Sequence, residues 1–274
     1  MQAISSVGWR TFEAKTRRWI DIGGRMLGGD DDGSRSRRTD GPSISAIPYQ
    51  EASDGKITQL LSERERDLIA QISVTVRFGR GDTIYRAGDP ATFLYNISSG
   101  VARTHRALLD GTRVVIGFFF PDDLIGLAEE GAYVNSAEAV TAITAYRLPM
   151  PALENLLRRD TTLEWHILVN LCHELREAQR HAVILKQQGA LARLALFLQM
   201  LDRSREARDG GAGEVSLPMT RSDIADYLGL SLATVSRSFR TFADRHLISF
   251  RDRRHLLIAD HAGLASLIAQ PRLE

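Results

Sequence analysis

The sequence predicts an α+β protein: an N-terminal β-roll (a double-stranded β-helix or jelly roll), a long dimerisation helix and a C-terminal winged helix-turn-helix. Short apolar segments separated by glycines run from about residue 57 to residue 148, as in closed or double-sheet β folds. A heptad stripe of apolar residues follows, which is typical of a helix that packs along another helix. Near the C-terminus, a glycine joins two segments with helical periodicity.

Residues 1–55 begin the chain and are rich in Gly, Asp, Ser and Arg. Such a composition has little apolar surface to bury. We therefore expect a disordered extension and assign no function to it.

Residues 56–150 are predicted to form the β-roll. A short helix is expected over 62–72, and strands over 74–78, 83–85, 93–97, 101–103 and 113–116, with the last strands within 137–148. Turn residues stand between these segments at regular intervals, which favours a roll over an open sheet.

Residues 151–189 are predicted to form one long helix, because helical periodicity runs from 151 to 187. Its apolar residues alternate steps of three and four, the spacing of a coiled-coil seam: Leu168, Leu171, Leu175, Ala178, Ala182 and Leu185. Such a stripe can also pack on the protein's own domain. A helix between two domains is covered over only part of its length, so we favour a symmetric homodimer.

Residues 190–274 are predicted to form a winged helix-turn-helix domain, with the motif itself at 220–240. Thr220 or Ser222 can cap the first helix, and Gly229 suits the sharp exit from it. Ser231 then caps a second helix whose inward residues are expected to be Leu232, Val235 and Phe239.

The second helix is predicted to read DNA. Its outward residues share one side, and we expect Ala233, Ser236 and Arg237 to face base edges in the major groove. A helical hairpin with a solvated basic face would explain the arginines but not the capping residue and glycine turn at matching positions. A two-fold dimer would place two such helices about 34 Å apart, one turn of B-DNA.

Two apolar segments at 247–250 and 256–258 predict a β-hairpin wing around a basic turn. Contacts to phosphates position a protein on DNA without reading its sequence. We expect such contacts from Thr220, Ser222, Ser231, Arg240, Arg251, Arg253 and Arg254.

Composition limits the remaining possibilities. The formal net charge is only +1, so DNA binding depends on where the arginines lie rather than on overall basicity. The single cysteine excludes a disulfide framework or a four-cysteine iron–sulfur cluster within one chain. No apolar run is long enough to span a bilayer and no signal-peptide core is present, so we expect a cytoplasmic protein.

Several motifs resemble the CRP/FNR superfamily of bacterial transcription regulators over residues 57–265. They are Gly79-Arg-Gly-Asp82, Ala87-Gly-Asp89, Ser99-Gly100, Phe120-Pro-Asp-Asp-Leu-Ile-Gly126 and residues 217–230. Leu124-Ile-Gly-Leu127 and Ala137-Glu-Ala-Val140 are similar to the FixK-like branch. The resemblance implies a cyclic-nucleotide-binding-like sensor roll in a homodimer that binds a palindromic promoter site and contacts RNA polymerase. It further implies an activator of microaerobic, nitrogen-oxide or respiratory genes.

Other positions depart from the family pattern. Leu127 and Asn135-Ser-Ala137 stand where cyclic-AMP-binding members carry a Glu and an Arg, which argues against the usual cyclic nucleotide mode. The N-terminal cysteine cluster of oxygen sensors is absent. His105 is the only histidine in the roll, and a lone histidine is a weak haem-ligand candidate. We therefore expect no cofactor and no metal, and leave the effector unassigned.

The recognition helix also departs, because Ala233 replaces the Glu of the family's Glu-x-x-Ser-Arg pattern. The half-site that the family binds is TTGAT-like, and the base preferred at one of its base pairs is therefore not predicted for this chain. We expect His166 and His173 to be exposed and Cys172 to be buried beside the seam.

Two alternatives remain open. A ligand-independent DNA-binding dimer, or a repressor of other genes, would carry the same motifs. A cupin-type metal enzyme needs clustered His and Glu ligands, which this roll lacks, so we expect no enzyme activity.

Overall fold

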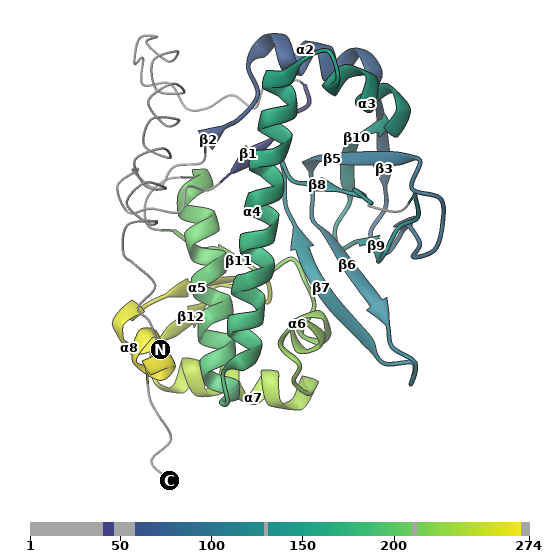
Figure 1. The fold of residues 1–274 in the computed structure, drawn as a ribbon. Helices are drawn as coiled ribbons and strands as arrows, with labels where there is room; N and C mark the ends of the chain where they lie inside the picture. Colours follow the sequence, from purple (N-terminus) through teal and green to yellow (C-terminus); the bar gives the residue numbers. More distant parts are fainter. Residues whose placement is uncertain (1–40, 47–57, 129–130, 210–212, 270–274) are drawn as a thin grey trace, which may run out of the picture. The chain divides into compact units, whose positions relative to one another are not determined.

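The computed structural model describes residues 41–46, 58–128, 131–209 and 213–269. Within these residues, strands form a roll, long helices follow it, and a small helical domain with a three-stranded sheet ends the described chain (Figure 1).

The roll consists of two four-stranded antiparallel sheets. One has the order β3 (Val74–Phe78), β10 (Ile143–Pro149), β5 (Phe93–Ser99) and β8 (Leu124–Ile125). The other has the order β4 (Thr83–Tyr85), β9 (Ser136–Ala139), β6 (Ala102–Ala107) and β7 (Arg113–Phe119). Neighbours in the sheets are mostly distant in sequence, as in a jelly roll, so the predicted fold class is confirmed.

Glycine is required at one tight point of the roll. Gly100 has a φ of 89°, and a Cβ atom there would lie 2.2 Å from the carbonyl oxygen of Ala142. Any side chain would therefore push β5 and β6 away from the start of β10.

A short segment near the N-terminus packs onto the roll. Ile44 is 2% exposed, and the amide of Ser43 donates to Asn96 Oδ1 at 3.0 Å. β1 (Ser45–Ala46) pairs with β2 (Thr58–Gln59) just before α2 (Glu63–Ile72). The predicted disordered extension over residues 1–55 is therefore wrong for 41–46, because Asn96 and the roll supply partners that composition does not reveal. The rest of that extension lies outside the described residues.

The predicted single helix over 151–189 is also wrong in detail. It is divided into α3 (Met150–Leu157) and α4 (Thr161–Lys186), because Asp160 is extended and caps α4 by accepting the amide of Leu163 at 3.1 Å. α5 (Ala190–Asp209) follows after a break at 187–189 and lies beside α4 (Figure 1).

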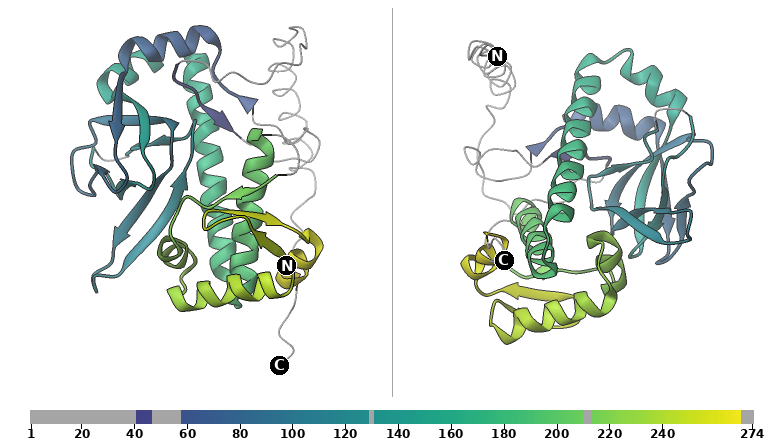
Figure 2. Two further views of the ribbon diagram at one scale, coloured as in Figure 1. Left: turned by 180° about the vertical axis from the view of Figure 1, so that it is seen from behind. Right: turned by 60° about the horizontal axis from the view of Figure 1, so that its bottom comes forward.

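The C-terminal domain contains α6 (Arg221–Leu228), α7 (Leu232–Asp244) and α8 (His261–Ala269). Its sheet has the order β11 (Val215–Ser216), β13 (His255–Ile258) and β12 (Ile248–Phe250), so the predicted two-stranded wing gains a third strand (Figure 2). Phe197 and Leu198 of α5 pack with Phe242 of α7 in a fully buried cluster. This core packs α7 against α5.

Candidate DNA interface

Reciprocal capping begins the helix-turn-helix. Thr220 Oγ1 accepts the amide of Asp223 at 3.1 Å, and Asp223 Oδ2 accepts the amide of Thr220 at 2.9 Å. Of the two predicted caps, the structure uses Thr220 and leaves Ser222 exposed in the first turn. Gly229 has a φ of 60°, which ends α6 in the left-handed conformation, and Ser231 caps α7.

α7 has one buried and one exposed face. Val235 and Phe239 are buried as predicted, but Leu232 is 52% exposed, so its predicted inward position is wrong. Leu232 is the first residue of α7, at the end of the helix next to the turn. The three residues predicted to face bases, Ala233, Ser236 and Arg237, are all exposed, and so is Arg240, which was expected to contact phosphate.

The wing is shaped by Asp252. Its carboxylate accepts the amides of Arg254 at 2.7 Å and His255 at 2.9 Å, and these bonds hold the pKa of Asp252 below its usual value. Arg253 and Arg254 are exposed at the turn. Arg251 is exposed but pairs with Glu214 at 2.9 Å, so a phosphate would compete with a carboxylate for it.

The other expected phosphate contacts lie on the same domain. Thr220, Ser222 and Ser231 are exposed at the N-terminal ends of α6 and α7, where backbone N–H groups and the helix dipole favour anions. The hydroxyls of Thr220 and Ser231 already cap their helices.

Arg221 was not anticipated by the sequence reasoning. Its guanidinium lies 3.3 Å from the ring centroid of Phe239 and 5.3 Å from that of Phe250, and burial lowers its pKa to about 10. It thus ties the first turn of α6 to the recognition helix and the wing. A positive charge in the first turn of a helix is unfavourable, because the helix dipole is positive at that end. Arg221 at this position was therefore the sequence signal that its guanidinium contacts another part of the domain.

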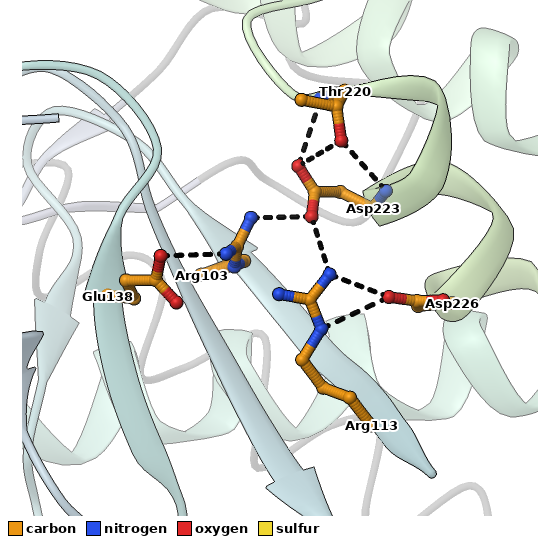
Figure 3. A network of polar contacts seen from close by, with 6 residues as sticks. All are labelled: Arg103, Arg113, Glu138, Thr220, Asp223 and Asp226. Carbon is orange, nitrogen blue, oxygen red and sulfur yellow. Dashed lines mark hydrogen bonds and ion pairs between the residues drawn. The ribbon is translucent and has the colours of Figure 1, made fainter. Parts of the chain in front are cut away.

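An ion network joins α6 to the roll (Figure 3). Asp223 Oδ1 pairs with Arg103 of β6 and, at 3.1 Å, with Arg113 of β7. Arg103 also pairs with Glu138 of β9 at 2.8 Å, and Arg113 with Asp226 of α6 at 2.7 Å. Asp223 therefore caps α6 with one carboxylate oxygen and docks it on the roll with the other.

Burial differs within the network. The side chain of Asp223 is 2% exposed and that of Arg103 is 10% exposed, whereas Arg113 and Asp226 are 34% and 26% exposed. The inner pair is thus shielded from water, and removing one partner would strand the other charge. No local sequence pattern signals this pairing.

A contact between α4 and α6 involves His181 and Tyr227. Their rings stack with centroids 3.8 Å apart, and His181 Nε2 lies 2.7 Å from the carbonyl oxygen of Tyr227. Burial lowers the pKa of His181, which favours the neutral ring.

The heptad stripe of α4 is exposed in the single chain, and two of its residues, Leu171 and Ala178, border a cavity between α4 and the roll. Every residue of the predicted seam is exposed: Leu168, Leu171, Leu175, Ala178, Ala182 and Leu185. Cys172 beside it is exposed in the single chain rather than buried. The predicted exposure of His166 and His173 is wrong, because the face opposite the seam packs on the protein. His166 Nδ1 lies 3.0 Å from Glu65 of α2, and His173 is 6% exposed.

In the part of the chain that the structure describes, no group of three or more His, Cys, Asp or Glu side chains could hold a metal ion. His105 of β6 is half-buried, and burial lowers its pKa. None of the described helices is long and apolar enough to cross a membrane.

Comparison with known proteins agrees with this architecture. A Crp-like helix-turn-helix domain model matches residues 192–267, and a cyclic nucleotide-binding domain model matches 75–160. The nitrogen fixation regulation protein FixK of Bradyrhizobium diazoefficiens is 36% identical over 171 residues, which cover 62% of this chain and 72% of FixK. The chain belongs to the CRP/FNR family of DNA-binding transcription regulators.

Further relatives extend the similarity of this CRP/FNR regulator. The transcriptional activator protein anr of Pseudomonas aeruginosa is 29% identical over 82% of this chain and 95% of its own length. The solved structure of FixK2 from Bradyrhizobium japonicum superposes with a TM-score of 0.67 and 29% identity, covering 73% of this chain and all of that one. The predicted family and fold are thereby confirmed.

Proposed function

We propose that this regulator binds a palindromic promoter site as a homodimer and activates genes of microaerobic, nitrogen-oxide or respiratory metabolism through contact with RNA polymerase. The observation that carries the proposal is the exposed face of α7, which is free of packing while its opposite face is buried. The names of its relatives, nitrogen fixation regulators and a transcriptional activator, support the choice of regulon and of activation.

Individual roles follow from position. We assign base reading to Ala233, Ser236 and Arg237, since a helix in the major groove presents this face to base edges. Exposed groups around the motif are assigned to phosphates: Thr220, Ser222, Ser231, Arg240, Arg251, Arg253 and Arg254. The exposed stripe of α4 is assigned to the dimer seam.

The assignment of the dimer seam and the assignment of the recognition helix support one another. An apolar stripe with Leu168 at 47% and Leu175 at 60% exposure is costly in water and is covered if a second copy packs along it. Two-fold symmetry would then present two α7 helices to inverted half-sites.

Selection of bound sites from randomised duplex DNA tests the proposal. Full-length protein should enrich two inverted half-sites whose centres are about 10 bp apart. Enrichment of single or directly repeated half-sites would contradict a two-fold dimer.

In vitro transcription from a promoter that carries the selected site, with purified RNA polymerase, distinguishes the two signs of regulation. An increase in transcript supports activation, and a decrease supports the alternative of a repressor.

A further inference from the structure

A cavity of about 430 Å³ lies between the roll, α4 and the helix-turn-helix domain. Its volume falls in the range of about 300–1,000 Å³ that small-molecule sites occupy. Phe118 and Phe120 form part of the wall from the roll, and Met200 of α5 and Tyr227 of α6 form part of the opposite wall. An occupant would therefore touch both the roll and the helix that precedes the recognition helix.

One polar side chain in this cavity has no partner. Asn170 of α4 lines it and is 1% exposed, yet neither its Nδ2 nor its Oδ1 makes a hydrogen bond within the described residues. Buried amides in folded proteins are nearly always hydrogen-bonded, because leaving them unpaired is costly. Asn96, the other buried asparagine, follows this rule: its amide group donates to the carbonyl of Ser43 at 2.6 Å and accepts the amide of Ser43 at 3.0 Å.

The charged groups in the wall have one sign. Among the described residues, four carboxylates line the cavity, those of Asp123, Glu154, Glu174 and Glu177, and no lysine or arginine does. Glu154 and Glu177 pair with Arg158 and Arg180, which are not lining residues, so Glu174 is the carboxyl group left for a ligand. Burial, with the charges of Asp123 and Glu177, raises the pKa of Glu174 to about 8. Glu174 lies four residues after Asn170 on the same face of α4, so one small molecule can reach both.

We propose that this cavity binds a small cationic amide, a molecule with an apolar body, a protonated amino group and a carboxamide or equivalent donor–acceptor pair. The carboxamide pairs with the side chain of Asn170, and the apolar body packs on the aromatic wall. The ammonium lies against Glu174 and favours its ionised form over the protonated one. A cyclic nucleotide would instead place its phosphate among carboxylates, with no guanidinium among the described lining residues to hold it. Leu127 and Asn135, which stand in the family's ligand positions, line the same cavity but supply no charge.

The contact with Tyr227 links such a ligand to DNA binding. Tyr227 is 4% exposed, stacks on His181 of α4 and belongs to the first helix of the DNA-binding motif. Seven residues of α4, about 10 Å, separate Glu174 from His181. A ligand whose apolar body reaches from Glu174 to Tyr227 therefore favours one placement of α6. This regulatory step rests on the proposed function, whereas binding itself does not.

Three probes with the same aromatic body test the site: the amide of naphthylalanine, which is cationic, its N-acetyl derivative, which is neutral, and N-acetylnaphthylalanine, which is anionic. Thermal unfolding of the full chain is measured with each. The cationic amide should raise Tm most, the neutral amide less, and the anion not at all. An anion that raises Tm as much as the cation, or a cationic amide that leaves Tm unchanged, overturns the proposal.

Two matched variants separate recognition from folding. Asn170→Leu removes an amide without partners, so its Tm should equal or exceed that of the wild type while the shift with the cationic amide disappears. Asn96→Leu removes a bonded amide and should lower Tm by several degrees, roughly 2–4 °C for each kcal/mol lost. If Asn170→Leu lowers Tm as Asn96→Leu does and keeps the probe shift, Asn170 is structural and the assignment fails.

A charge variant tests the other half of the site. Glu174→Gln should reduce the Tm shift of the cationic amide to that of the neutral one. A preference for the cation that survives in Glu174→Gln contradicts the assignment of the ammonium. None of these measurements uses DNA, so a negative result in them would not contradict the DNA-binding proposal. A negative result in the site selection would likewise not contradict ligand binding in the cavity.

Discussion

Replacing Asp223 with asparagine should strongly destabilise the protein, because the carboxylate joins two parts of the fold. Asparagine keeps the size of the side chain and an oxygen that can still cap α6. It loses the charge that faces Arg103 and Arg113 in a site where Asp223 is 2% exposed.

The magnitude follows from burial. Removing one partner of a buried ion pair costs about 3–5 kcal/mol. Arg103 keeps Glu138 at 2.8 Å, so we expect the lower end, about 3 kcal/mol. At about 2–4 °C per kcal/mol for a chain of this size, Tm should fall by about 6–12 °C.

Asp226→Asn is the matched control. It lies on the same helix and pairs with the same Arg113 at 2.7 Å, but both side chains are about a quarter to a third exposed. Water screens such a pair, so its removal should cost about 1 kcal/mol or less and lower Tm by no more than about 4 °C.

Differential scanning calorimetry of both variants decides the question, with Arg103→Met as a third. Once Asp223 is neutral, Arg103→Met should cost less than in the wild type, because the interaction is already broken. Equal Tm losses for Asp223→Asn and Asp226→Asn would refute the view that burial of the inner pair docks α6 on the roll.

Four further outcomes are expected. Arg237→Ala should relax specificity at one position of each half-site by about 1–3 kcal/mol, whereas Arg253→Ala should weaken binding to all sequences similarly, as measured by competition binding. Leu175→Glu should yield monomers in sedimentation and weaken binding to a palindrome. Ala233→Glu places a carboxylate one turn before Arg237 and should sharpen a preference for cytosine at one base pair in site selection. The pKa of Glu174 is raised to about 8 in the native state. Between the ordinary pKa of a glutamic acid and pH 8, the native state therefore keeps a proton that the unfolded state has lost. Stability should therefore fall between pH 5 and pH 8, and Glu174→Gln should remove much of that fall in Tm.

Each of these has a contrary result. An unchanged base preference in Arg237→Ala would mean that α7 is not the reading helix. If Leu175→Glu dimerises as strongly as the wild type, the apolar stripe of α4 is not the dimer seam. Identical selected sites for Ala233→Glu and wild type would show that residue 233 does not face the bases. If the Tm of Glu174→Gln changes with pH as that of the wild type does, another titratable group causes the pH dependence of stability.

The sequence by itself determined the elements whose signals are local. A cap at Thr220 or Ser222, the left-handed turn at Gly229 and the inward positions Val235 and Phe239 lie within one short segment, where each residue acts on its own backbone. Only the choice of Thr220 over Ser222 came from the structure. The roll followed from short strands and turns for the same reason, and the exposed stripe containing Leu175 followed from helical spacing alone.

Tertiary structure decided the rest. Asp160 breaks the long helix where periodicity continues, and Ile44 is buried although its neighbourhood is polar. Composition and periodicity describe each segment by itself. They contain no information about which other part of the fold will pack against that segment.

The docking network and the cavity are the clearest case. Arg103 and Asp223 are 120 positions apart, and Asn170 and Tyr227 line one cavity only after α4 has packed between two domains. A charge or an amide has the same local preferences whether water or a buried partner faces it, so its energetic role is set by burial, which only the assembled fold determines.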